Sequence, residues 1–109
     1  MATIYKVLGQ SSPAATTETD LYTVPAATST IASSVIVCNR SATLATFRIS
    51  IAVGGGATAN KDYIYYDLPI GANDTFIATI GVTLAATDKV KVYASSTNLS
   101  FSLYGSEIT

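Results

Sequence analysis

The stretch Thr46-Phe47-Arg48-Ile49-Ser50-Ile51-Ala52-Val53 decides the fold class of this chain. Its large apolar residues recur at every second position, so Phe47, Ile49, Ile51 and Val53 share one face of an extended strand. The residues between them occupy the other face. This pattern predicts a strand that is buried on one side and solvated on the other.

The same alternation recurs in the C-terminal part of the chain. Residues 89–94 and 99–104 follow it on either side of the turn-forming run Ser95-Ser96-Thr97-Asn98, and together they predict a C-terminal hairpin. Shorter runs predict further strands over residues 3–8, 21–24, 31–39, 63–68 and 75–80, and no segment sustains a helical period. The residues expected to point inward are Phe47, Ile49, Ile51, Val90, Val92, Leu99, Phe101 and Leu103.

About eight short strands without helices favour an antiparallel β-sandwich. The chain length allows one domain over residues 1–109, in which residues 1–20 form a first strand and an extended connection. Residues 24–31, 68–75 and 84–88 each end a strand and restart it after small or turn-forming residues, as a crossing between sheets requires. Jelly-roll and immunoglobulin-like connections both remain open.

The chain has few of the residue types that carry enzyme chemistry. The 109 residues include no histidine and one cysteine, and 12% are charged, against a usual share of about 25%. Catalytic triads and imidazole metal ligands therefore cannot form, and we expect neither enzymatic activity nor a cofactor. Cys38 ends the apolar run Val35-Ile36-Val37-Cys38 and is predicted to be a buried thiol.

Charge and hydropathy exclude two classes of partner. The formal net charge is −1, without a basic run, which argues against nucleic acid. No apolar run approaches the roughly 20 residues of a membrane span, and the N-terminus lacks the apolar segment of a secretory signal. We expect no membrane partner.

Glycines and acids that resemble ligand sites fail the spacing tests for those sites. Gly54-Gly55-Gly56 lacks the phosphate-loop pattern and is interpreted as a hairpin loop. Asp62, Asp67 and Asp74 lack the spacing of a calcium loop, and each stands beside turn residues. We interpret them as solvated turn carboxylates rather than as metal ligands or a glycosidase pair.

Three tyrosines form the candidate interaction site. Alternation places Tyr63 and Tyr65 on the face opposite Ile64 and Tyr66, so one of the two pairs must lie away from the core. A tyrosine offers a large rigid area and a polar tip, which suits a protein contact, sugar stacking or ordinary packing on the outer face of a sheet. Tyr63, Tyr65 and Tyr66 are therefore a candidate interface.

Six stretches spread from Met1 to Thr109 carry a family resemblance: Met1-Ala-Thr-Ile-Tyr-Lys-Val-Leu-Gly-Gln10, Leu21-Tyr-Thr-Val-Pro25, Val37-Cys-Asn-Arg-Ser41, Asn60-Lys-Asp-Tyr63, Ile70-Gly-Ala-Asn-Asp-Thr75 and Gly105-Ser-Glu-Ile-Thr109. In these stretches the chain resembles a family of small all-β structural proteins of tailed bacteriophages, including cyanophages. The resemblance implies a virion component present in many copies, assembled in the host cytoplasm, on the tail or its fibres or decorating the outer capsid like a cement protein. It carries over no catalytic or ligand residue.

The expected partners follow from the resemblance and from the composition together. A β domain with few charges can contact equivalent copies without a large desolvation cost, so we expect contacts with its own copies and with other virion proteins. Self-association as a trimer or larger ring is expected through the outward face of residues 63–67. The alternative is a carbohydrate-binding module that recognises a glycan on the host surface.

Overall fold

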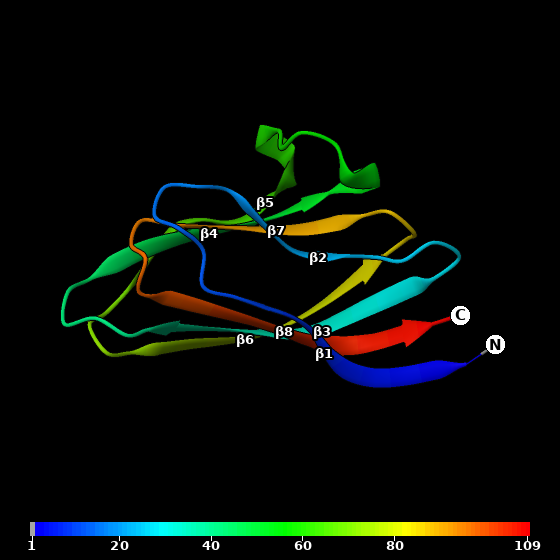
Figure 1. Ribbon diagram of the computed structural model, residues 1–109, viewed down its shortest axis with the longest axis horizontal. Helices are drawn as coiled ribbons and strands as arrows, with labels where there is room; N and C mark the ends of the chain where they lie inside the picture. Colours follow the sequence, from blue (N-terminus) through cyan, green and yellow to red (C-terminus); the bar gives the residue numbers. More distant parts are fainter. Residues whose placement is uncertain (1) are drawn as a thin grey trace.

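A computed structural model describes residues 2–109, which form two four-stranded antiparallel sheets packed face to face (Figure 1). Sheet A has the strand order β1-β8-β3-β6 and sheet B the order β2-β7-β4-β5. The strands are β1 (Thr3–Ser11), β2 (Thr19–Thr23), β3 (Ser29–Asn39), β4 (Ala45–Ala52), β5 (Tyr63–Ile70), β6 (Thr75–Leu84), β7 (Lys89–Ala94) and β8 (Leu99–Ile108). The predicted all-β sandwich is confirmed.

The strand pairing identifies the topology as a jelly roll. Strand β1 pairs with β8, β2 with β7, β3 with β6 and β4 with β5, as if one long hairpin had been wrapped into two sheets. An immunoglobulin sandwich instead places its first two strands side by side in one sheet. The two chain ends meet at one end of the molecule, where the backbones of Ala2 and Thr109 exchange hydrogen bonds (Figure 1).

The predicted C-terminal hairpin is wrong, because β7 lies in sheet B and β8 in sheet A. Ser95 is held to the neighbouring β4, where its backbone N–H donates to the carbonyl oxygen of Thr46 and its hydroxyl accepts from the Thr46 N–H. The chain then crosses to the other sheet. A local turn pattern fits either path, since only the distant pairing partners decide between them.

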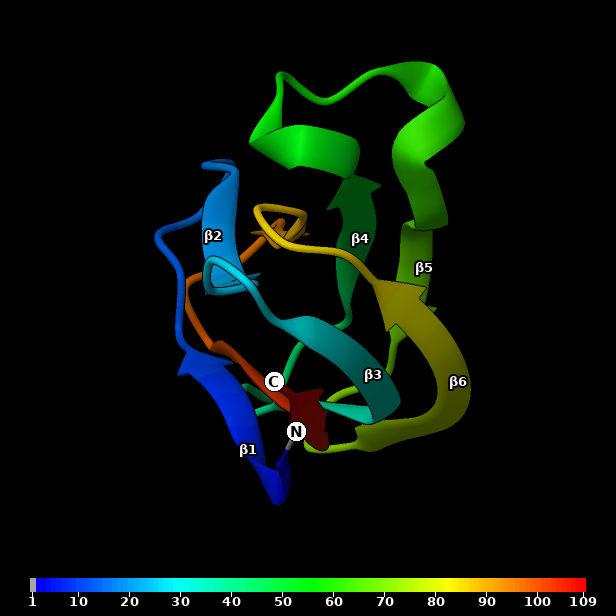
Figure 2. The ribbon, with the colours of Figure 1, turned by 90° about the vertical axis from the view of Figure 1, so that its right-hand side faces the viewer.

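The three predicted crossings are confirmed. They join β2 to β3, β5 to β6 and β6 to β7, each time from one sheet to the other. The glycine-rich hairpin loop is also confirmed between β4 and β5, where Gly54 and Gly55 have φ of +71° and +74°. This loop contains the short helices η1 (Val53–Gly55) and η2 (Asn60–Asp62) and lies over the outer face of sheet B (Figure 2).

The core lies between the sheets and follows the predicted alternation closely. Seven of the eight expected core residues are at most 1% exposed, and Ile51 packs against them but is only partly buried. Val53 is 75% exposed because the strand ends before it. Cys38 corrects a prediction, since it is only half-buried and lies on the outer face of sheet A. The run around it alternates like the others, so that Val35 and Val37 point inward.

A buried polar contact joins the two sheets near the chain ends. The Tyr22 hydroxyl of β2 donates to a carboxylate oxygen of Glu107 in β8 at 2.5 Å and lies 2.8 Å from the Thr30 hydroxyl in β3. Burial, followed by the contact with Glu107, raises the pKa of Tyr22 to about 12. The Tyr22 hydroxyl, followed by Lys6, lowers the pKa of Glu107.

No helix among residues 2–109 is both long enough and apolar enough to cross a membrane.

Candidate functional site

The structure separates the three candidate tyrosines of β5. Tyr65 points into the sandwich, with its ring centroid 6.2 Å from that of Phe47 and 5.3 Å from that of Phe76. Tyr66 is 59% exposed, and Tyr63 packs edge-on against it at 4.9 Å between centroids. The prediction that Tyr63 and Tyr65 share a face is therefore wrong.

A β-bulge explains this difference. Tyr65 pairs with Ile49 and Tyr63 with Ser50, so two steps along β5 match one step along β4. The extra residue, Ile64, brings Tyr63 beside the outward-facing Ser50 instead of the inward-facing Ile51. Tyr63 and Tyr66 therefore meet on the outer face of sheet B.

The contacts around Tyr66 are made within the chain. The Arg48 guanidinium lies 4.3 Å from the centre of the Tyr66 ring and 4.5 Å from that of Tyr93. Asp67 accepts from Nε of Arg48 at 2.7 Å and from its Nη2 at 3.3 Å, which raises the pKa of the guanidinium. The exposed Tyr66 and the partly buried Tyr63 are thus already packed within the chain, and their role as an interface stays a prediction.

The outer face of sheet A differs from the tyrosine cluster in having no charge. Within residues 2–109, the cross-strand pairs place only uncharged side chains on this face, from its end near the chain termini to its opposite end at Ser100. The outward positions of its central rows are Tyr5, Ser106, Ile31 and Thr83, then Val7, Tyr104, Ser34 and Thr79, then Gln10, Ser102, Ile36 and Ile77, then Ser100, Cys38 and Thr75. We call these residues the uncharged face.

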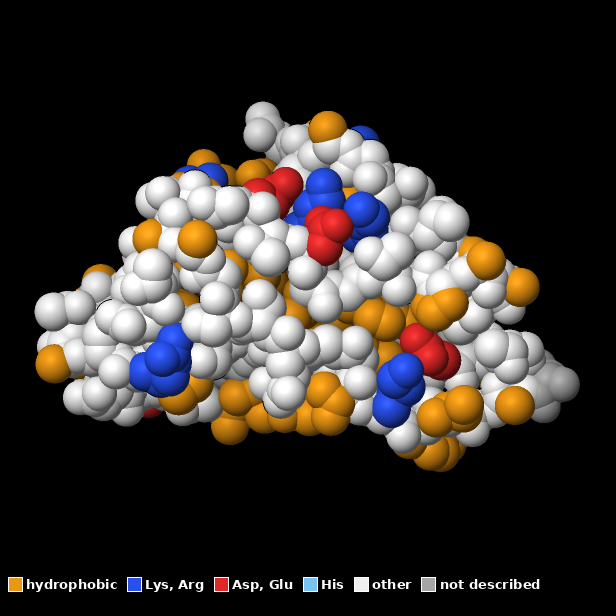
Figure 3. All heavy atoms as spheres, in the orientation of Figure 1, with side chains coloured by type: hydrophobic (Ala, Val, Ile, Leu, Met, Phe, Trp, Pro, Cys, Tyr) orange, Lys and Arg blue, Asp and Glu red, His pale blue; other side chains and the backbone are white. Residues whose placement is uncertain are grey.

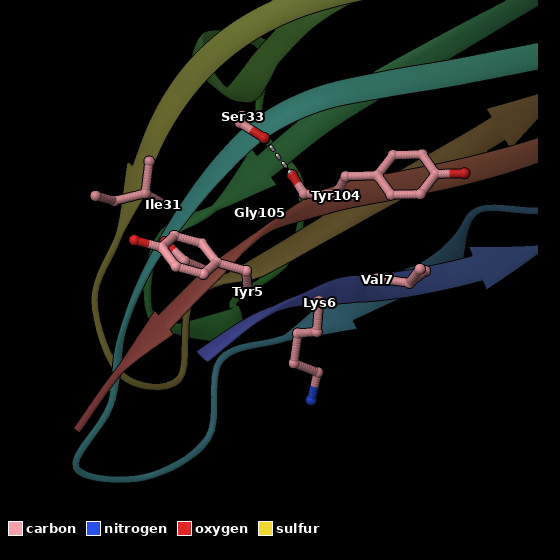
Figure 4. Close-up of a pocket in the computed structure, with 8 residues that line it drawn as sticks. Tyr5, Lys6, Val7, Ile31, Ser33, Tyr104 and Gly105 are labelled. Carbon is pink, nitrogen blue, oxygen red and sulfur yellow. Dashed lines mark hydrogen bonds between the residues drawn. The ribbon is translucent and has the colours of Figure 1, made fainter. Parts of the chain in front are cut away.

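A shallow hollow of about 590 Å³ opens in the uncharged face between β1, β8 and β3 (Figure 4). Tyr5, which is 84% exposed, stands at its edge, and Ile31 and Tyr104 line it. Gly105 allows β8 and β3 to approach closely here, because a Cβ atom at this position would lie 2.0 Å from the carbonyl oxygen of Ile31. Lys6 also borders this hollow, but its side chain leaves β1 on the side opposite Tyr5 (Figure 4) and pairs with Glu107.

Charged side chains gather instead over sheet B. Four of the five ion pairs within residues 2–109 lie there: Arg48–Asp67, Lys61–Asp62, Lys89–Asp20 and Lys91–Glu18. The loop over residues 53–62 covers part of this face, where Lys91 donates to the carbonyl oxygen of Gly56. Figure 3 shows a cluster of acidic and basic side chains over the upper sheet and hydrophobic side chains along the lower margin, where sheet A lies, with a basic group and a basic–acidic pair near the two ends of that margin.

The three acids considered as metal ligands stand apart. Asp74 is exposed in the turn between β5 and β6 and accepts from the Thr75 N–H, as predicted. Asp67 corrects the prediction, because it lies within β5 and pairs with Arg48 instead of standing in a turn. Asp62 corrects the prediction because it is 8% exposed. The backbone N–H of Ala59 and then Lys61 lower its pKa. No group of three or more potential metal ligands occurs within residues 2–109.

Sequence reasoning did not find the uncharged face. Its signal was present, since β3, β6 and the outward positions of β1 and β8 contain no charged residue. The signal could not be read, however, until the topology showed that these four strands share one sheet.

A scan of protein-family models found no match, and a search of curated protein sequences found no significant similarity. The resemblance to phage structural proteins therefore stays a prediction from the sequence.

Proposed function

We propose that this protein is a non-enzymatic structural component of a tailed-phage virion, present in many copies. It attaches to the tail or its fibres or decorates the outer capsid. The observation that supports this function best is the uncharged face, which extends over all four strands of sheet A. The assignment to a phage rests on the sequence resemblance alone.

The physical argument concerns desolvation. A charged side chain that is buried in a contact without a partner costs several kcal/mol, and the cores of protein interfaces contain few charges. The uncharged face presents hydroxyls, tyrosine rings and exposed apolar side chains such as Ile77, which is 68% exposed. A neighbouring protein can cover such a surface at little electrostatic cost.

The proposal is tested on particles of a phage that encodes this chain. Peptides of the protein should be found by mass spectrometry in gradient-purified virions at many copies per particle, and cryo-electron microscopy should show a matching sandwich on the tail or capsid. If the protein stays in the soluble lysate and is absent from purified particles, the virion role is wrong. Hydrolysis of a polysaccharide that is lost in Asp67→Asn would overturn the non-enzymatic role.

A glycan-binding module is the second candidate. Tyr63 and Tyr66 suit sugar stacking poorly because they pack edge-on against each other and Arg48 lies over the Tyr66 ring. Tyr5 is a better platform, since it is exposed beside the hollow. A glycan array with the wild-type protein and Tyr5→Ala tests this function, which would be supported by binding that the variant loses.

A further inference from the structure

We infer that the uncharged face binds the same face of a second copy of this chain, forming a two-fold dimer. The inference deepens the proposed function by naming the partner of its contact face. It also moves the self-association expected at residues 63–67 from sheet B to sheet A.

Electrostatics favour a second copy as the partner. A charged group brought against the uncharged face would find no opposite charge there, apart from Arg40 and the Lys6–Glu107 pair at its margins. The partner surface must itself be uncharged over a similar area. The chain carries one such surface within residues 2–109, because the outer face of sheet B holds four ion pairs.

The size of the face fits a dimer. Strands β8 and β3 have 10 and 11 residues, which at about 3.4 Å per residue gives a length of roughly 34 Å. Four strands about 4.8 Å apart give a width of roughly 19 Å, and thus a flat area of roughly 650 Å². A standard specific interface buries about 800 Å² on each partner. Because side chains such as the Tyr5 ring project from the sheet, the surface that can be buried is larger than this flat area.

Two-fold symmetry makes this contact self-complementary. In such a dimer the same patch serves on both partners, so each favourable contact occurs twice. Tyr5 is the most exposed aromatic side chain of this face and is expected to anchor it, because a tyrosine ring buries a large area at low entropic cost.

Two matched pairs of variants test the contact by sedimentation equilibrium. Thr79→Glu and Tyr5→Ala change the uncharged face, whereas Thr23→Glu and Tyr66→Ala make the same exchanges at exposed positions of sheet B. The wild type should sediment at twice the chain mass of 11.3 kDa at tens of micromolar. We expect Thr79→Glu and Tyr5→Ala to weaken dimerisation by about tenfold or more, and the two controls to leave it within about twofold. Circular dichroism checks that each variant is folded.

Cys38 provides an independent measurement, since the only cysteine of the chain lies on the uncharged face. Its alkylation by a maleimide should slow as protein concentration rises in the wild type and in Thr23→Glu, but not in Thr79→Glu. A wild type that stays monomeric, a trimer, or a dimer that only the sheet B variants disrupt would each overturn the inference. A protein that is monomeric in solution but abundant in virions would refute this contact and leave the proposed function standing. A protein that dimerises through this face but is absent from virions would support the contact and refute the proposed function.

Discussion

Replacing Phe101 by alanine should remove a large part of the stability of the sandwich. Phe101 lies in β8 and is 1% exposed, and its ring meets that of Phe47 edge-on at 6.0 Å between centroids. Truncation of a buried phenylalanine costs about 3–5 kcal/mol, because apolar contacts are lost and a cavity remains. The upper half of that range is expected here, since an aromatic pair contributes about 0.5–1.5 kcal/mol beyond its buried area.

Urea denaturation followed by circular dichroism measures this loss. A domain of 109 residues is expected to unfold with a free energy of about 5–15 kcal/mol, so the variant should lose about a quarter of its stability or more. Ser102→Ala is the control, because the next residue of the same strand points outward and should change the free energy of unfolding by less than about 0.5 kcal/mol. A loss below about 1 kcal/mol for Phe101→Ala would show that this side chain is not in the core.

Four further predictions concern the pH dependence of stability, two single substitutions and the effect of metal ions. Since the pKa of Tyr22 is raised to about 12 from about 10 in the unfolded chain, stability should be full below pH 10 and fall between pH 10 and 12; Tyr22→Phe, compared by thermal unfolding across this range, should lose that dependence. Asn39→Ala should cost about 1–3 kcal/mol in urea unfolding, because the buried Asn39 amide donates to the carbonyl oxygens of Thr43 and Gly71 at 2.9 and 3.1 Å. Gly105→Ala should lower the free energy of unfolding in urea by about 1–3 kcal/mol, since the added Cβ must push β8 away from β3. Neither EDTA nor added calcium should shift the melting temperature by several degrees, and a shift of that size would reveal a metal site.

Period-two alternation was sufficient to find the strands but not to place them. Each predicted strand exists, and several extend further than predicted. Strand β8 continues through Tyr104 to Ile108, because its pairing with β1 and β3 persists past Gly105. Pairing depends on residues far apart in the sequence, so the path from β7 into β8 could not be read from residues 95–98.

The prediction of the candidate tyrosine interface was wrong in which side chains share a face. The local pattern around Tyr63 and Tyr65 is regular, and a single unpaired residue, Ile64, turns one of them over. Whether a strand contains a bulge depends on its partner strand, which the pattern of one segment cannot show. The role of Asn39 has no local signal either, since its buried amide donates to carbonyl oxygens in two separate parts of the chain, at Thr43 and at Ile70 and Gly71.

The two outer faces of the sandwich differ in whether their side chains find partners within the chain, and this difference links the fold to the proposed function. On sheet B, the residues that follow β4 form a long loop, and the carbonyl oxygen of Gly56 in this loop accepts a hydrogen bond from the Lys91 ammonium. The charged groups of this face therefore find partners within the chain. On sheet A, Tyr5 and Ile77 remain 84% and 68% exposed, within a surface whose charged groups lie only at its margins. Exposed apolar side chains on an uncharged sheet favour association. A chain that worked alone would gain solubility from one lysine or glutamate at Thr79, so the uncharged character of four adjacent strands favours a protein whose working state covers this face.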